Sequence, residues 1–180
     1  TDNWAIYFND GTTKISFFFN SSAAINPAQA SYWPANDPTS SVFYIGTDSA
    51  VNGSASMTYV GYAWAEIPGY SKIGKYIGNG ASRGTFIFLG FRPAWIMIRS
   101  LNSASWNIFD TTRDEYNVTQ KRLRANSTDT EVSEAATYID VLSNGFQMRN
   151  TDAEFNTNDV SYIYMAFADE PGTTPFETFP

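Results

Sequence analysis

The repeated stretches YVGYAWAEIPG (residues 59–69) and YIYMAFADEPG (residues 162–172) decide the fold. Both are rich in aromatic and β-branched residues, which favour a pleated strand, and both end in a Pro-Gly turn. They lie 103 positions apart, and Phe43 matches Phe146 at the same offset. Two further matches, WAIY (4–7) with WNIF (106–109) and NS (20–21) with NS (126–127), have offsets of 102 and 106. The chain therefore contains two copies of one unit, with loop insertions causing the drift.

The two copies are not equally complete. The second, residues 70–172, has roughly eight strand-like runs, which is the number in a jelly-roll sandwich. The first, residues 1–69, has nothing that matches Lys75–Arg99 and so lacks three of those strands. We therefore predict an all-β protein: an antiparallel jelly-roll-type β-sandwich in two tandem copies, the first incomplete. Residues 173–180 would form a tail or an arm that docks on a neighbour through Phe176 and Phe179.

The incomplete first copy poses a physical problem. Its strands alone would leave open sheet edges and an uncovered apolar face, which natural proteins avoid. The missing strands would lie upstream in a longer polypeptide or come from a neighbouring subunit; alternatively, both copies merge into one sandwich. The chain starts at Thr1 rather than Met, which we interpret as a piece of something longer.

Strand and turn patterns fill most of the chain. Asp10-Gly11 predicts a hairpin turn between two apolar runs, and Ser143-Asn144-Gly145 predicts a second one. Only Glu131–Ala136 has a composition that favours a helix, and it is too short to stand alone. The predicted strands are Trp4–Phe8, Ile15–Phe19, Val42–Ile45, Met57–Ala65, Ser71–Ile77, Thr85–Leu89, Trp95–Ile98, Trp106–Asp110, Tyr138–Leu142, Phe146–Arg149 and Ser161–Ala168.

Charge and composition exclude several functions. Apolar residues make up 43% of the chain against 16% charged, which excludes a disordered chain. The net charge of −7 with no basic cluster predicts that nucleic acid is not a partner. No apolar run approaches the ~18 residues that a membrane span needs, so we expect no membrane insertion. Cysteine and histidine are absent, which excludes disulfides, thiolate metal sites and the commonest general base.

Catalysis and cofactors are not expected. Without His or Cys, a hydrolase would need paired carboxylates, and no Asp or Glu stands in an apolar setting that would raise its pKa. We predict no enzyme, no catalytic residues, no cofactor and no metal. Calcium could use Asn and Asp oxygens, as at Asn9-Asp10, at Asp152 with Asn156 or at Asn158-Asp159, but such residues also form turns by themselves.

Carbohydrate binding is the sharper hypothesis, because sugar sites combine an exposed aromatic face with amide and carboxylate groups. One loop offers this mixture, and a second group follows the strand that ends at Asp110. The alternatives are that Trp33 packs under its own loop and that Arg113 forms a structural ion pair with Asp110. The candidate ligand-binding residues are Tyr32, Trp33, Asn36, Asp37, Arg113, Tyr116 and Asn117.

Five motifs follow one another through the second copy: YSKIGKYIGNG (70–80), GFRPAW (90–95), WNIFD (106–110), LSNGF (142–146) and YIYMAFA (162–168). In this combination the second copy resembles a repeat found in tail-fibre and minor structural proteins of marine bacteriophages. The resemblance covers nearly all of that copy and, less strongly, the first. It implies a laminin-G-like or jelly-roll sandwich, a location in the virion and a role at the host surface, and it brings no catalytic residues.

We therefore expect a virion structural protein, part of a phage tail fibre or similar appendage, with host-surface glycan recognition. Its partners would be copies of itself, other virion proteins and a glycan. Two alternatives stay open: a head-decoration or surface-filament protein with a purely structural role, and a carbohydrate-binding module of a larger enzyme.

Overall fold

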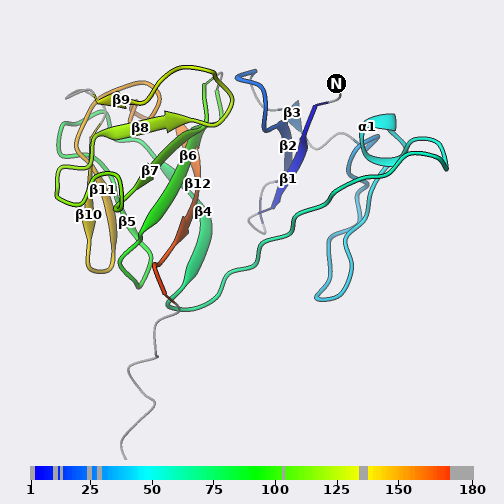
Figure 1. Cartoon of the computed structure of the whole chain (residues 1–180), viewed down its shortest axis with the longest axis horizontal. Coiled ribbons are helices and arrows are strands. Elements are labelled where there is room, and N and C mark those ends of the chain that lie inside the picture. Colours follow the sequence, from blue (N-terminus) through cyan, green and yellow to red (C-terminus); the bar gives the residue numbers. More distant parts are fainter. Residues whose placement is uncertain are drawn as a thin grey trace, which may run out of the picture. The chain divides into compact units, whose positions relative to one another are not determined.

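The computed structural model describes residues 3–9, 12, 14–23, 26–27, 30–102, 104–133 and 138–170 (Figure 1). It is an all-β protein built from antiparallel sheets, which confirms the predicted fold class. Two compact units are present, Thr1–Ala63 (unit 1) and Trp64–Pro180 (unit 2). The predicted copies, divided after residue 69, and the jelly-roll connectivity stay predictions. The docking arm, 173–180, lies outside the described residues.

Unit 2 is a sandwich of two sheets. One has the strand order β4-β12-β6-β7-β8-β9 and the other β10-β11-β5, and all neighbouring strands are antiparallel. The strands are β4 (Ser71–Ile77), β5 (Phe86–Phe88), β6 (Trp95–Ser100), β7 (Asn107–Asp110), β8 (Lys121–Arg124), β9 (Val132–Ser133), β10 (Ile139–Leu142), β11 (Gly145–Met148) and β12 (Ser161–Phe167).

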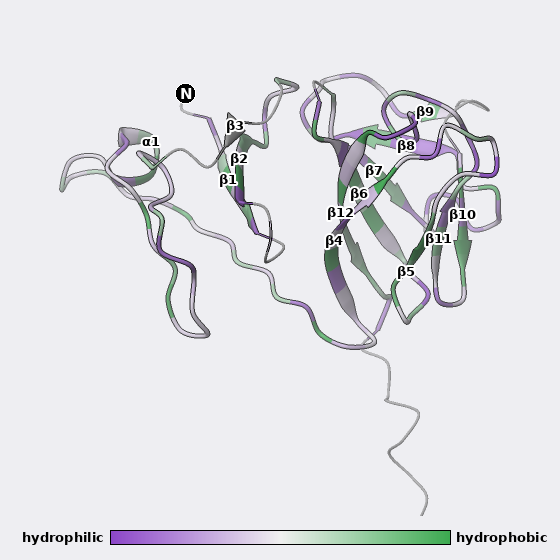
Figure 2. Ribbon diagram, turned by 180° about the vertical axis from the view of Figure 1, so that it is seen from behind, coloured by the Kyte–Doolittle hydropathy of each residue, from purple (hydrophilic) through white to green (hydrophobic). Residues whose placement is uncertain are grey.

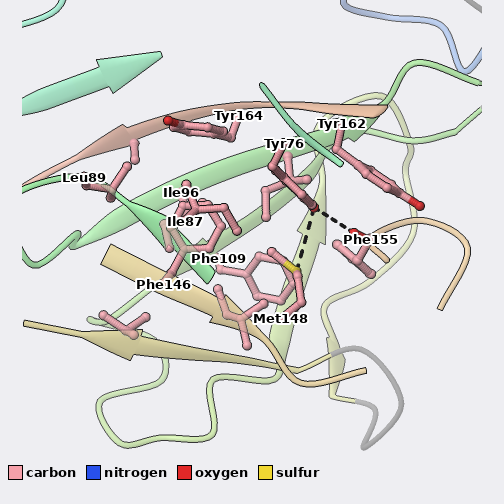
Figure 3. Packing of buried hydrophobic residues seen from close by; sticks show 14 of the residues in the cluster. Tyr76, Ile87, Leu89, Ile96, Phe109, Phe146, Met148, Phe155, Tyr162 and Tyr164 are labelled. Carbon is pink, nitrogen blue, oxygen red and sulfur yellow. Dashed lines mark hydrogen bonds between the residues drawn. The ribbon is translucent and has the colours of Figure 1, made fainter. Parts of the chain in front are cut away.

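A dry aromatic core lies between these sheets (Figure 3). Tyr76 of β4 stacks on Tyr162 of β12, with ring centroids 5.0 Å apart, and its hydroxyl donates to the Phe155 carbonyl at 2.8 Å. Phe146 of β11 contacts Tyr164 edge-on from the opposite sheet, at 5.6 Å. Burial raises the pKa of Tyr164 to about 12, because the core disfavours the phenolate. Aromatic residues from both sheets therefore hold the sandwich together.

Gly145 of β11 allows this strand to approach β5 in the smaller sheet. A Cβ at this position would overlap the Ile87 carbonyl oxygen of β5, which no side chain tolerates. The glycine of the predicted Ser143-Asn144-Gly145 turn is thus needed for packing against β5.

Unit 1 contains a smaller sheet of order β1-β2-β3. Its elements are β1 (Ala5–Asn9), β2 (Lys14–Phe18), β3 (Asn26–Pro27) and one short helix, α1 (Ser49–Asn52). The predicted hairpin of the first two strands is confirmed, although its Asp10-Gly11 turn lies outside the described residues. The short helix was not predicted from the sequence.

The β1-β2-β3 sheet shares its strand register and a side-chain hydrogen bond with β7-β8-β9. The Trp4 N–H donates to Asn20 Oδ1 at 3.0 Å, and the Trp106 N–H donates to Asn126 Oδ1 at 2.8 Å. The strand register is shared as well. The equivalent pairs are Ile6↔Phe17 and Ile15↔Pro27 in unit 1, and Ile108↔Leu123 and Lys121↔Ser133 in unit 2. The internal repeat read from the sequence is therefore also a repeat of structure over these strands.

A second match lies at α1, where the sequence comparison had found none. Asp48 caps this turn by accepting from the Ala50 N–H at 2.9 Å, and Asp152 accepts from the Glu154 N–H at 2.7 Å. Tyr59 and Tyr162 then anchor the following segment by the same pair of hydrogen bonds. The partners are Gly53 N (2.6 Å) and Ser49 O (2.7 Å) for Tyr59, and Thr157 N (2.9 Å) and Ala153 O (2.9 Å) for Tyr162.

Several local predictions were wrong. Val42–Ile45 and Met57–Ala65 form no strand, because the structure places no neighbouring strand beside either segment. Figure 1 draws the second of them as a trace without a strand arrow. The segment predicted to favour a helix contains β9 instead, because pairing with neighbours overrides weak local preferences.

Candidate functional site

A cluster of polar groups surrounds Asp37 in unit 1. The Lys14 ammonium lies 2.7 Å from Asp37 Oδ1 and donates to the Ala35 carbonyl at 3.1 Å. The Asn9 amide donates to the same carboxylate oxygen at 3.0 Å, and the Tyr7 hydroxyl donates to it at 3.5 Å. The hydrogen bond from Lys14 lowers the pKa of Asp37, so the carboxylate stays ionised in mildly acidic solution.

An aromatic pair borders this cluster. The rings of Tyr7 and Trp33 lie 5.6 Å apart at an angle of 46°, and both side chains are half-buried. The Trp33 indole Nε1 is buried and has no hydrogen-bond partner within the part of the chain that the structure describes. Trp33 therefore packs against Tyr7 of β1, and its side chain stays partly exposed beside the carboxylate, the amide and the ammonium.

The other two loop candidates contribute less. The Tyr32 ring packs edge-on against Phe18 at 5.7 Å, and its carbonyl accepts from the Gly46 N–H, so it holds the loop. Asn36 is exposed next to Asp37. Of the four predicted residues in this loop, Trp33 and Asp37 have the geometry of a ligand site, and Asn36 borders it.

The sequence analysis missed three members of the site: Tyr7, Asn9 and Lys14. The pairing register of the β1-β2 hairpin places these three residues close together. Tyr7 and Asn9 are two positions apart and share one face of β1, and Asn9 pairs directly with Lys14 of β2. Only the return of the loop to this face, which sequence spacing does not show, brings Asp37 and Trp33 to them.

The candidates in unit 2 have mostly structural contacts. Arg113 forms an ion pair with Asp110, and its Nη1 lies 2.6 Å from Glu131 Oε2. Its Nη2 donates to the Ile108 carbonyl at 3.3 Å. Burial raises the pKa of Asp110, but hydrogen bonds from the backbone and side chain of Arg113 outweigh burial and lower it. This guanidinium therefore ties the loop after β7 to the segment before β9.

Asn117 connects its loop to β10. Its Nδ2 donates to the Val141 carbonyl and its Oδ1 accepts from the Val141 N–H, both at 2.8 Å, so the amide imitates a neighbouring strand. Tyr116 is 75% exposed beside it. Tyr116 is thus the candidate in unit 2 whose side chain is most open to a ligand. The two sets of candidates belong to different units and form two separate candidate sites.

Metal-binding geometry is not found in the described ranges, which contain no group of three acidic, His or Cys side chains that could hold an ion. Asp152 caps its turn. The Asn156 amide is buried and fully hydrogen bonded, and Asn158 donates to Asp159 at 2.7 Å. The predicted candidates for calcium therefore stabilise turns.

The fold defines this chain as an antiparallel β-sandwich protein with an internal repeat. The chain belongs to the family described as Domain of unknown function (DUF7483), which matches residues 1–171 and so includes both units. A search of curated proteins and a search of solved structures found no match. Within the described residues, no helix is long and apolar enough to cross a membrane.

Proposed function

We propose that this chain is a virion structural protein, part of a phage tail fibre or similar appendage, that recognises a host-surface glycan through the site around Trp33 and Asp37. One observation carries the recognition half: a partly exposed aromatic pair lies beside a carboxylate, an amide and an ammonium. Aromatic faces pack on the apolar faces of sugars, and the polar groups can hydrogen bond to hydroxyls.

The charge arrangement narrows the ligand. Asp37 accepts hydrogen bonds and carries a negative charge, whereas Lys14 neutralises it locally. A neutral sugar with several hydroxyls suits this pair, because both ions can exchange part of their mutual contact for hydroxyl groups without leaving a charge unpaired. An acidic sugar would meet Asp37 at close range, so we expect weaker binding of acidic glycans.

The virion half of the proposal comes from the resemblance to marine phage structural proteins. A low basic content and a rigid sandwich that presents loops suit a structural part that works by geometry.

We expect no hydrolysis, because the carboxylates of the candidate sites are engaged with Lys14 or Arg113. The head-decoration and surface-filament alternative predicts no glycan binding. The carbohydrate-binding-module alternative predicts glycan binding without a place in a particle.

A glycan array probed with the full chain tests recognition. We expect neutral glycans to bind, and both Trp33→Ala and Asp37→Asn to weaken binding about tenfold or more, the effect of losing roughly 1.4 kcal/mol. Phe88→Ala is the matched control, since Phe88 is an exposed aromatic residue in unit 2 outside both sites. Loss of binding in Tyr116→Ala alone would move the site to unit 2, and no binding by the folded chain would contradict recognition.

Labelling of particles tests the virion location. Antibodies to this chain should bind the tail appendages of phage that carry the sequence, seen by electron microscopy. Labelling over the head would favour the decoration alternative, and unlabelled particles would contradict a virion role.

A further inference from the structure

Apolar side chains are exposed along two segments of unit 1 that the sequence marks as strands. Val60 is 72% exposed, whereas its counterpart in unit 2, Ile163, is 3% exposed. Phe43 is 59% exposed, whereas its counterpart Phe146 is fully buried. Figure 2 shows hydrophobic positions along the trace that leads into β4 as well as along β4 itself. Soluble proteins rarely leave so many large apolar residues uncovered in one place.

The repeat identifies which neighbours are missing. In unit 2, β12 lies between β4 and β6, and β11 pairs with β5. Residues 59–65 correspond to β12 and residues 42–45 to β11, but no strand of the described chain pairs with either. The β1 strand corresponds to β7, which pairs with β6, and β1 has β2 as its sole neighbour in its sheet. Residues 36–39 correspond to β10 at the same offset and are present in the chain, although they form no strand. The positions that have no counterpart in residues 1–69 are those of β4, β5 and β6.

A second copy of this chain is a poor donor for these positions. Its own β4–β6 segment provides Tyr76, Ile96 and Ile98 to the core of unit 2. Releasing the segment would expose that core, and transfer of large apolar side chains from a closed core to water is unfavourable. If one copy donated this segment to another, unit 2 of the donor would therefore lose its closed core while unit 1 of the acceptor gained one.

The length of a connection indicates how a donor would be attached. In unit 2, β6 ends at Ser100 and β7 begins at Asn107, with Trp106 hydrogen bonded to Asn126 just before the strand. Unit 1 reproduces that hydrogen bond at Trp4. A β6-like strand can thus reach the free edge of β1 through an equally short link, and such a link adds little loop-closure entropy.

We propose that unit 1 is completed by a segment with the strand pattern of residues 71–100, joined ahead of β1 in the same polypeptide. Its β6-like strand pairs with both β1 and residues 59–65, its β4-like strand pairs with the other edge of residues 59–65, and its β5-like strand pairs with residues 42–45. The exposed residues then become the core of a second sandwich. This inference is independent of glycan binding, which requires only the hairpin and loop around Asp37.

The chain itself supplies a donor for the test. A duplicate of residues 70–102 is joined ahead of Thr1 in the full chain, which restores the spacing of the link in unit 2. We expect the amides of residues 59–65 and 42–45 to exchange with solvent about 100-fold more slowly, because buried strand pairing suppresses local opening. The matched control carries Ile96→Asp and Ile98→Asp in the duplicate alone, and should show no added protection.

An engineered disulfide reports the register directly, since the chain has no cysteine. Met165 pairs with Met97 in unit 2, and Tyr62 is the counterpart of Met165. Tyr62→Cys with Met97→Cys in the duplicate should therefore form an intramolecular disulfide, because paired strand positions lie about 5 Å apart. Tyr62→Cys with Arg92→Cys in the duplicate is the mismatched control.

Two outcomes would overturn the inference. One is equal exchange in the duplicate and its control, together with equal disulfide formation in the Tyr62→Cys/Met97→Cys variant and in the mismatched variant. The other is protection of residues 59–65 in the unextended chain together with a dimer in sedimentation, which would make a second copy the occupant. Loss of glycan binding in any of these variants would count against the proposed function. It would not change the conclusion about strand pairing in unit 1.

Discussion

Units 1 and 2 carry the same strand patterns, the same capped turn and the same tyrosine anchor, and yet only unit 2 closes into a sandwich. The difference lies in three strands. Where β4, β5 and β6 are present, the segment after the capped turn becomes β12 at the centre of a six-stranded sheet. Where their counterparts are lacking, the equivalent residues 59–65 form no strand. Strand propensity alone does not make a strand; a neighbour on the edge does.

The largest contrast is expected at the matched pair Phe146 and Phe43. Phe146→Ala should lower the free energy of unfolding by about 3–5 kcal/mol, because it opens a cavity in a closed core. Phe43→Ala should change it by less than about 0.5 kcal/mol, because Phe43 is exposed. Urea unfolding followed by tryptophan fluorescence measures both. Equal losses would mean that unit 1 buries Phe43 in solution.

An intermediate contrast is expected at Asn156 and Asn52, which hold the same capped turn. Asn156 is fully buried, and its amide donates to Asn79 Oδ1 and to the carbonyls of Ala81 and Asn150. Asn156→Ala should cost about 2–3 kcal/mol, because it leaves buried partners unpaired.

Asn52 donates to the Gly46 carbonyl alone and is exposed, so Asn52→Ala should cost about 1 kcal/mol or less. The same urea titration measures both variants. A larger loss for Asn52→Ala would show that unit 1 has the tighter turn.

The smallest contrast concerns acid stability. The pKa of Asp110 lies below its ordinary value of 3.8, so its ionised form stabilises the fold above pH 3.8. That stabilisation is lost as the pH falls below 3.8 and through the folded pKa. Asp110→Asn should thus lower stability at pH 7 by up to about 1 kcal/mol and by less at pH 3.

Asp37 is the matched control in unit 1, because its pKa is also lowered but its ion pair is exposed. We expect Asp37→Asn to leave the unfolding midpoint unchanged at both pH values, since water and salt screen an exposed pair. A pH dependence as strong as that of Asp110 would contradict the exposed position of Asp37.

The candidate site was only partly predictable. Trp33 and Asp37 were found from the composition of their loop. Tyr7, Asn9 and Lys14 were not, because these residues are distant from Asp37 in the sequence, by about 30 residues for Tyr7, and contact it only in the folded chain. In unit 2, Arg113 and Asn117 were selected for their chemistry, but their side chains are engaged with Glu131 and Val141. Residue type identifies what a side chain can do, and contacts decide whether it is available.

The sequence by itself determined the all-β class, the internal repeat and most strands of unit 2, because alternation, turn residues and β-branched content are local properties that each strand carries with it. Only the tertiary structure decided that residues 42–45 and 59–65 form no strand and that the loop of Asp37 returns to β1. Both depend on which distant segments are present to pair, and hydrogen bonds between strands form only where a second edge is within reach.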